Sequence, residues 1–68
     1  MSLQINLNGK PASFENITTI AELVNHLGYA KKRIAIEANG NIIPRSEYEK
    51  TRLASNDSLE IITAVGGG

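Results

Sequence analysis

The chain ends in Val65-Gly66-Gly67-Gly68, where a carboxylate follows three residues that have no side chains. Glycine loses the most backbone entropy on folding, so we expect residues 65–68 to form a flexible tail. At roughly 3.3–3.6 Å per residue, this tail reaches about 13 Å, far enough to enter a narrow slot in another protein. We expect the carboxylate of Gly68 to be the reactive group and Gly66 and Gly67 to thread the partner's slot. A frayed end or a leftover linker is the alternative.

The sequence shows no catalytic or metal-binding constellation. It has no cysteine, so a disulfide, a thiolate metal site and a persulfide on the chain itself are excluded. His26 is the single histidine, which is insufficient for a zinc site, and we expect it to be solvated. The glycine run lacks the lysine and helix that follow a phosphate-binding loop. We therefore expect no catalytic residue, no bound metal and no bound cofactor.

Composition and charge restrict the partners. The 68 residues suffice for a single domain, residues 1–68, with a thin core. Seven basic residues balance seven acidic ones, which argues against nucleic acid and membrane surfaces as partners. The sequence contains no signal peptide and no long apolar run, so we expect a cytoplasmic location. Lys31-Lys32-Arg33 is either a solvated loop or a docking patch for an acidic partner.

Periodicity predicts strands at both ends of the chain. Residues 3–7 alternate between apolar and polar side chains, as in a strand with one buried face. Asn8-Gly9 is typical of a two-residue hairpin turn into a second strand over residues 10–15. Pro11 cannot donate a ladder hydrogen bond, so we expect that strand either to lie at a sheet edge or to begin after Pro11. The last strand is expected over residues 59–65.

A short helix is expected near residue 20. Thr19 and Glu22 have the spacing of a capping box, and Gly28 suits the position after the helix end. We expect this helix to be about ten residues long. Its apolar stripe consists of Ile20, Leu23, Val24 and Leu27. The remaining expected elements are a strand over residues 33–38, a short strand at 42–43 and a helical turn with a loop over 46–53.

These elements predict an α+β fold. One helix with an apolar stripe must cover the apolar face of a mixed sheet of about five strands. The first and last strands are rich in branched apolar residues and lack proline, so we place them side by side, parallel, in the middle of the sheet. This arrangement is the β-grasp, the fold of ubiquitin.

The last strand also predicts a docking surface. Leu59 and Ile61 are expected to face the core, so that Ile62 and Ala64 face the other way. Together with Val65 they would form an apolar patch beside the tail, where a partner docks. The alternative is a bulge that buries Ile62.

Four segments, 4–10, 19–24, 35–45 and 57–68, make the chain similar to one known family. The segment from Asn41 through Ile42-Ile43-Pro44-Arg45, joined to a terminal Gly-Gly at this chain length, is the most specific part. Over its whole length the chain resembles the ThiS family of ubiquitin-like sulfur carriers. The chain departs from the common family ending, which is two glycines after an apolar residue, because three glycines follow Val65. The role that the family implies is therefore carried over to the last two glycines.

The resemblance implies a carrier on which partner enzymes act, and not an enzyme. A ThiF-like adenylyltransferase would use ATP to convert the Gly68 carboxylate to an acyl-adenylate. A sulfur-relay desulfurase system would turn this into a thiocarboxylate. A ThiG-like thiazole synthase would take the sulfur for thiamine biosynthesis. Two alternatives stay open: a sulfur carrier for molybdopterin synthesis, and a non-covalent β-grasp interaction module.

Overall fold

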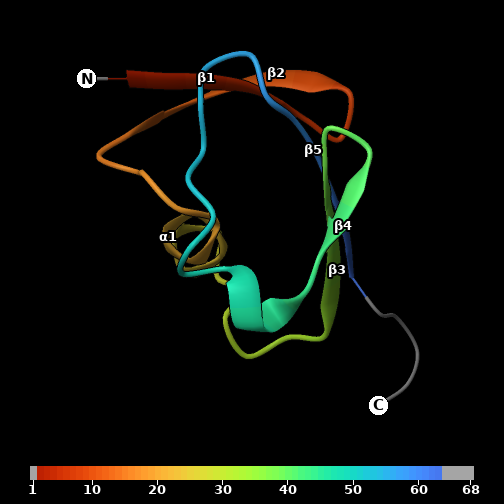
Figure 1. Ribbon diagram of the computed structural model, residues 1–68. Coiled ribbons are helices and arrows are strands. Elements are labelled where there is room, and N and C mark those ends of the chain that lie inside the picture. The colour runs from red at the N-terminus through yellow and green to blue at the C-terminus, as the bar shows by residue number, and fades with distance from the viewer. Residues whose placement is uncertain (1, 64–68) are drawn as a thin grey trace.

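The computed structural model describes residues 2–63, in which five strands form one mixed sheet and a helix packs against one face of it (Figure 1). The elements are β1 (Ser2–Leu7), β2 (Lys10–Glu15), α1 (Ile20–His26), β3 (Ile34–Ala38), β4 (Asn41–Ile43), a 3-10 turn (Arg45–Glu47) and β5 (Ser58–Thr63). Ala64, Val65 and the three glycines, on which the tail prediction rests, lie outside the described residues.

The sheet order is β2-β1-β5-β3-β4, which places the last strand of the chain in the centre. β1 and β5 are parallel, and the other neighbouring strands are antiparallel. A parallel pair needs a long crossover connection, and α1 lies in that connection. The predicted β-grasp order is thereby confirmed.

Two hairpins with the same chemistry flank the central strand. Asn8 and Gly9 have φ of 53° and 81°, and Asn39 and Gly40 have φ of 52° and 86°. These positive φ angles are what a two-residue turn of this type requires, and asparagine and glycine adopt them at low cost. β2 is an edge strand, as Pro11 predicted.

The helix begins with the predicted capping box. The amide of Glu22 donates to Oγ1 of Thr19 at 3.2 Å, and Oε1 of Glu22 accepts from the amides of Thr19 and Thr18 at 3.1 and 2.6 Å. The helix is seven residues long, shorter than predicted. The reason is that Leu27 is already the C-cap residue and Gly28, with φ of 81°, turns the chain away.

The core lies between α1 and the three central strands. Each contributes alternating or helically spaced apolar side chains, as the periodicity predicted, and Tyr48 closes the core from the loop after the 3-10 turn. The buried residues are Leu3, Ile5, Ile20, Leu23, Val24, Ile36, Tyr48, Leu59 and Ile61. Among the described residues no polar or charged residue is buried. The fold is thus held by apolar packing.

We expect the capping box to make stability depend on pH. Hydrogen bonds from the backbone amides of Thr18 and Thr19 hold the pKa of the Glu22 carboxyl below its ordinary value of 4.5. A lowered pKa in the folded state means that the carboxylate stabilises the fold above that ordinary value and stops doing so as pH falls through the folded-state pKa. Glu22→Gln should therefore lower the free energy of unfolding by more at pH 7 than at pH 3, as measured by urea denaturation.

Thr19→Ala is the matched control, because it breaks the same box without removing a titrating group. It should cost about 1 kcal/mol at both pH values. An equal effect of Glu22→Gln at pH 7 and pH 3 would show that the charge of Glu22 is irrelevant to the cap.

Candidate functional site

The predicted reactive tail follows β5, so the describable part of the site is the end of this strand. β3 flanks β5 along one side up to the last described residue, because Ile34 pairs with Thr63 and Ala35 with Ile62. On the other side β1 pairs with Ser58 and Leu59 alone. Gly66, Gly67 and Gly68 follow this end in sequence, and their role stays a prediction.

The asparagine of the first hairpin turn extends the β1 side of this support. Its side chain Nδ2 donates to the carbonyl oxygen of Ile61 at 3.3 Å, and its Oδ1 accepts from the amide of Ile61 at 2.7 Å. Sequence reasoning identified Asn8 as a turn residue and missed these bonds. The two residues are 53 positions apart in the chain, so no local pattern indicates their contact.

Ile62 lies on the sheet face opposite α1. Its side chain is 59% exposed, whereas its neighbour Ile61 is 7% exposed and packs in the core. The pairing of β3 with β5 runs without interruption from Ala38–Leu59 to Ile34–Thr63, so there is no bulge to bury Ile62. Ile62 is therefore available to a partner, while Ala64 and Val65, the other predicted members of the patch, lie outside the described residues.

A shallow hollow adjoins Ile62. It is lined by Arg33, Ile34, Ala35 and Ile62, so a basic side chain borders an apolar surface. Glu37 and Glu60 pair directly across β3 and β5, two residues from Ala35 and Ile62 along the strands. These carboxylates lie along the edge of the apolar surface that is farther from Thr63.

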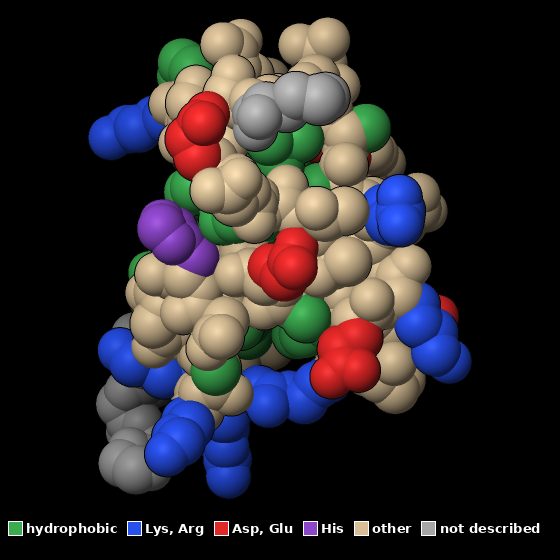
Figure 2. Space-filling model, turned by 90° about the vertical axis from the view of Figure 1, so that its left-hand side faces the viewer, with side chains coloured by type: hydrophobic (Ala, Val, Ile, Leu, Met, Phe, Trp, Pro, Cys, Tyr) green, Lys and Arg blue, Asp and Glu red, His purple; other side chains and the backbone are tan. Residues whose placement is uncertain are grey.

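Basic side chains gather at one end of the molecule, as Figure 2 shows for the face that α1 covers. Lys31, Lys32 and Arg33 are exposed in the connection between α1 and β3. Arg45 joins them, because its Nη2 donates to the carbonyl oxygen of Lys32 at 2.8 Å. Since β3 begins where β5 ends, this basic segment lies at the end of the sheet where Thr63, the last described residue, is placed.

Two other residues with polar side chains, His26 and Arg52, lie outside the end of β5 and its neighbours. His26 is exposed at the end of α1, and its ring is edge-on to Phe14 with centroids 5.6 Å apart. Arg52 forms an isolated bridge with Thr19 beside the start of α1. No group of three His, Cys, Asp or Glu residues in the described part of the chain is placed to hold a metal ion. No helix within residues 2–63 is long and apolar enough to span a membrane.

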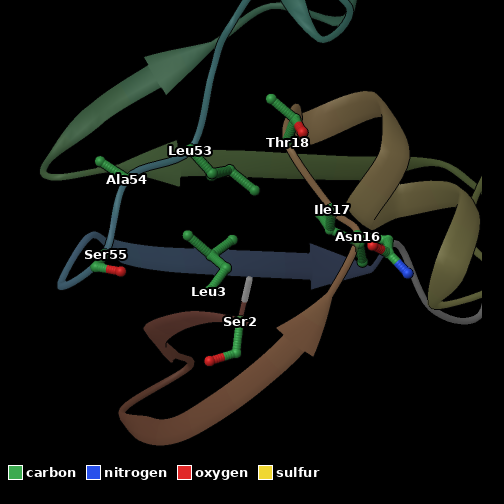
Figure 3. Close-up of a pocket in the computed structure, with 8 residues that line it drawn as sticks. All are labelled: Ser2, Leu3, Asn16, Ile17, Thr18, Leu53, Ala54 and Ser55. Atoms are coloured by element: carbon green, nitrogen blue, oxygen red, sulfur yellow. The ribbon is translucent and has the colours of Figure 1, made fainter.

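A groove of about 390 Å³ lies at the other end of the sheet (Figure 3). Its side chains are small and polar or aliphatic, and none of them is ionisable. They belong to Ser2, Leu3, Asn16, Ile17, Thr18, Leu53, Ala54 and Ser55. The start of β1 lies beyond the start of β5, so this groove is remote from Thr63. It contributes nothing to a site at the tail.

Comparison with known proteins assigns the chain to a family. The model of the ThiS family matches residues 5–68, which include the tail. The sulfur carrier protein ThiS of Bacillus subtilis is 34% identical over 65 residues, which cover 94% of this chain and 98% of that protein. An uncharacterized protein, ycf40 of Porphyra purpurea, is 36% identical over 98% of this chain and 94% of its own length.

Two further comparisons concern a solved structure and a relative that is longer than this chain. The crystal structure of the thiamine biosynthesis protein ThiS from Geobacter metallireducens superposes with a TM-score of 0.81 at 26% identity, covering 97% of this chain and all of that one. A thiazole synthase of Magnetococcus marinus is 35% identical over 97% of this chain, and the match spans 20% of that longer protein. The extent of these matches, from the first strand to the glycine tail, shows that the chain belongs to the ThiS family.

Proposed function

We propose that this chain carries sulfur to thiazole formation in thiamine biosynthesis, on the carboxylate of Gly68. The observation that carries the proposal is the match to the family through residue 68, together with the similarity to a sulfur carrier over nearly all of both chains. The described residues support it in a second way. They form a scaffold whose central strand, β5, is the last element before the glycines in the sequence.

The proposed chemistry takes place in partner enzymes. A carboxylate oxygen of Gly68 attacks the α-phosphorus of ATP in a ThiF-like adenylyltransferase, and pyrophosphate leaves. The terminal sulfur of a cysteine persulfide of a sulfur-relay desulfurase system then attacks the acyl carbon and displaces AMP, which leaves an acyl disulfide. A thiol of the relay cleaves the sulfur–sulfur bond that came from the persulfide, and the relay is left as a disulfide. The product is a terminal thiocarboxylate. Adenylation is needed because a carboxylate is a poor acyl donor, and the use of ATP fits a cytoplasmic protein.

Thiazole formation is favoured over molybdopterin synthesis by two relatives. Thiazole synthases of Magnetococcus marinus and Paramagnetospirillum magneticum each contain a segment similar to 97% of this chain, and the segment occupies 20% of each protein. A carrier and the enzyme that consumes its sulfur benefit from being joined, because tethering raises their effective concentration. A ThiG-like thiazole synthase is therefore the proposed acceptor.

The adenylyltransferase is the proposed occupant of the surface around Ile62. This side chain is exposed beside the hollow formed with Arg33 and Ala35, and Gly68 follows it six positions later in the chain. At about 3.3 Å per residue, a partner bound there lies within about 20 Å of the carboxylate. An apolar contact with an acidic rim that pairs with Arg33 would fit this surface. Ala64 and Val65 would extend the contact toward the tail.

Removing the last two glycines should abolish function without affecting the fold. The deletion moves the terminal carboxylate two residues back, to Gly66, so that it no longer reaches the ATP held by the partner, but it changes nothing in β5 or the core. Adenylation, followed as pyrophosphate release with the purified adenylyltransferase, should fall to background, and thermal unfolding should be unchanged. Thiazole formation at the native rate by this deletion variant would refute the proposal. A variant ending in Ala-Ala-Ala that stays fully active would favour the non-covalent module.

Ile62→Ser should weaken docking. Loss of one well-packed apolar contact at an interface centre raises the KM for the carrier in adenylation by about tenfold, or about 1.4 kcal/mol. Ile42→Ser is the matched control, because Ile42 is 72% exposed on the same sheet face but lies on the outer strand β4. Its KM should stay within about twofold of the native value. Equal effects of the two substitutions would place the docking surface elsewhere.

A further inference from the structure

The parallel pairing of β1 with β5 continues past the end of β1. The amide of Asn6 donates to the carbonyl oxygen of Asp57 at 2.9 Å, and the amide of Asn8 donates to that of Leu59 at 2.8 Å. Backbone groups that point toward β1 thus recur at every second residue, at Asp57, Leu59 and Ile61. β1 ends at Leu7, and the next backbone groups, those of Ile61, are bound by the side chain of Asn8.

The primary amide of Asn8 here replaces a peptide group of a strand that has already turned away. It has one donor and one acceptor in the arrangement that a backbone amide would offer, so it binds both the N–H and the C=O of Ile61. The left-handed backbone of Asn8, with φ of 53°, combines the turn and this contact in one residue. Beyond Ile61 the described pairing of β5 is with β3 alone.

We propose that Asn8 is a positioning residue for the reactive tail. By fixing Ile61 on the β1 side, it sets the point and direction in which the chain leaves the sheet after Thr63. This inference rests on the proposed function, because it assumes that the tail must enter the slot of the adenylyltransferase while Ile62 is docked. A misplacement of about 1 Å at a reacting group can reduce a rate by about a hundredfold.

The second hairpin provides an internal comparison. Asn39 has the same turn position and nearly the same φ, 52°, and its side chain also binds the strand: Nδ2 donates to Oδ1 of Asp57 at 3.1 Å, and Oδ1 accepts from the amide of Ser58 at 2.9 Å. These contacts hold the start of β5, whereas those of Asn8 hold its end. The two asparagines therefore stabilise the same strand, but only Asn8 binds its C-terminal half.

The test compares Asn8→Gly with Asn39→Gly. Glycine accepts the positive φ at both turns, so each substitution removes the side-chain hydrogen bonds without straining the backbone. Amide hydrogen exchange, followed by NMR, should become about tenfold faster at Ile61 in Asn8→Gly and stay within about twofold in Asn39→Gly. Asn8→Asp keeps the acceptor for the Ile61 amide but loses the donor to its carbonyl, and should show an intermediate effect.

Adenylation kinetics supply the functional measurement. Asn8→Gly should lower kcat for adenylation by about tenfold while the KM for the carrier stays within about twofold, because docking through Ile62 is intact and entry of the tail is not. Asn39→Gly should leave both constants near native values, although it weakens the same strand. Ile62→Ser is expected to act in the opposite way, because it should change KM and not kcat.

The possible outcomes separate this proposal from the function on which it rests. Equal kinetics for Asn8→Gly and Asn39→Gly overturn it, and so does unchanged exchange at Ile61. Faster exchange with native kcat also overturns it, because the contact would then stabilise the strand without positioning the tail. If the native protein is not adenylated, the proposed function fails. In that case the positioning role of Asn8 is tested by NMR relaxation of residues 64–68. Relaxation that is unchanged in Asn8→Gly overturns this role.

Discussion

The structure depends on the central position of its last strand. β5 pairs in parallel with β1 on one side and antiparallel with β3 on the other, and its buried side chains meet α1. β5 is held from both sides as far as Ile61, by β1 and the side chain of Asn8 on one side and by β3 on the other, and β3 alone continues to Thr63. The direction of the strand is thereby fixed relative to the core. A C-terminal tail that follows such a strand starts from a rigid base. The same tail after an edge strand would start from the part of a sheet that opens first.

The small size of the domain determines which of its surfaces are free to meet partners. A chain of 68 residues has a thin core and no room for an enclosed active site. The buried face of the sheet is occupied by packing against α1, which leaves the opposite face and the tail to meet partners. In the proposed function the partners bring ATP, the sulfur donor and the catalytic groups, and the carrier brings a positioned carboxylate together with an exposed Ile62.

Much of the fold was predictable because its signals are local. The Asn8-Gly9 turn, the Thr19 and Glu22 capping box and Gly28 each depend on residues within a few positions of one another, and all three are present as predicted. The helix was predicted too long, because an apolar stripe does not show whether its last member lies in the helix or in the cap. Leu27 is in the cap.

The candidate site was less predictable, because it depends on contacts between distant residues. Alternation placed Ile62 opposite the core but could not exclude a bulge, and the uninterrupted register with β3 decided the matter. The contact of Asn8 with Ile61 joins a turn to a strand 53 residues later and has no periodic signature. The proposal that Gly68 carries the reactive group rests on the glycine tail and on the family resemblance.

The intact mass of the protein is the most direct measurement of the central claim. The native chain is incubated with ATP, the adenylyltransferase and a persulfide donor, and its mass is then compared with that of the untreated chain. The account predicts a gain equal to the replacement of one oxygen atom by sulfur, located by fragmentation at Gly68. An unchanged mass under conditions in which the same partners load an authentic ThiS carrier would contradict it.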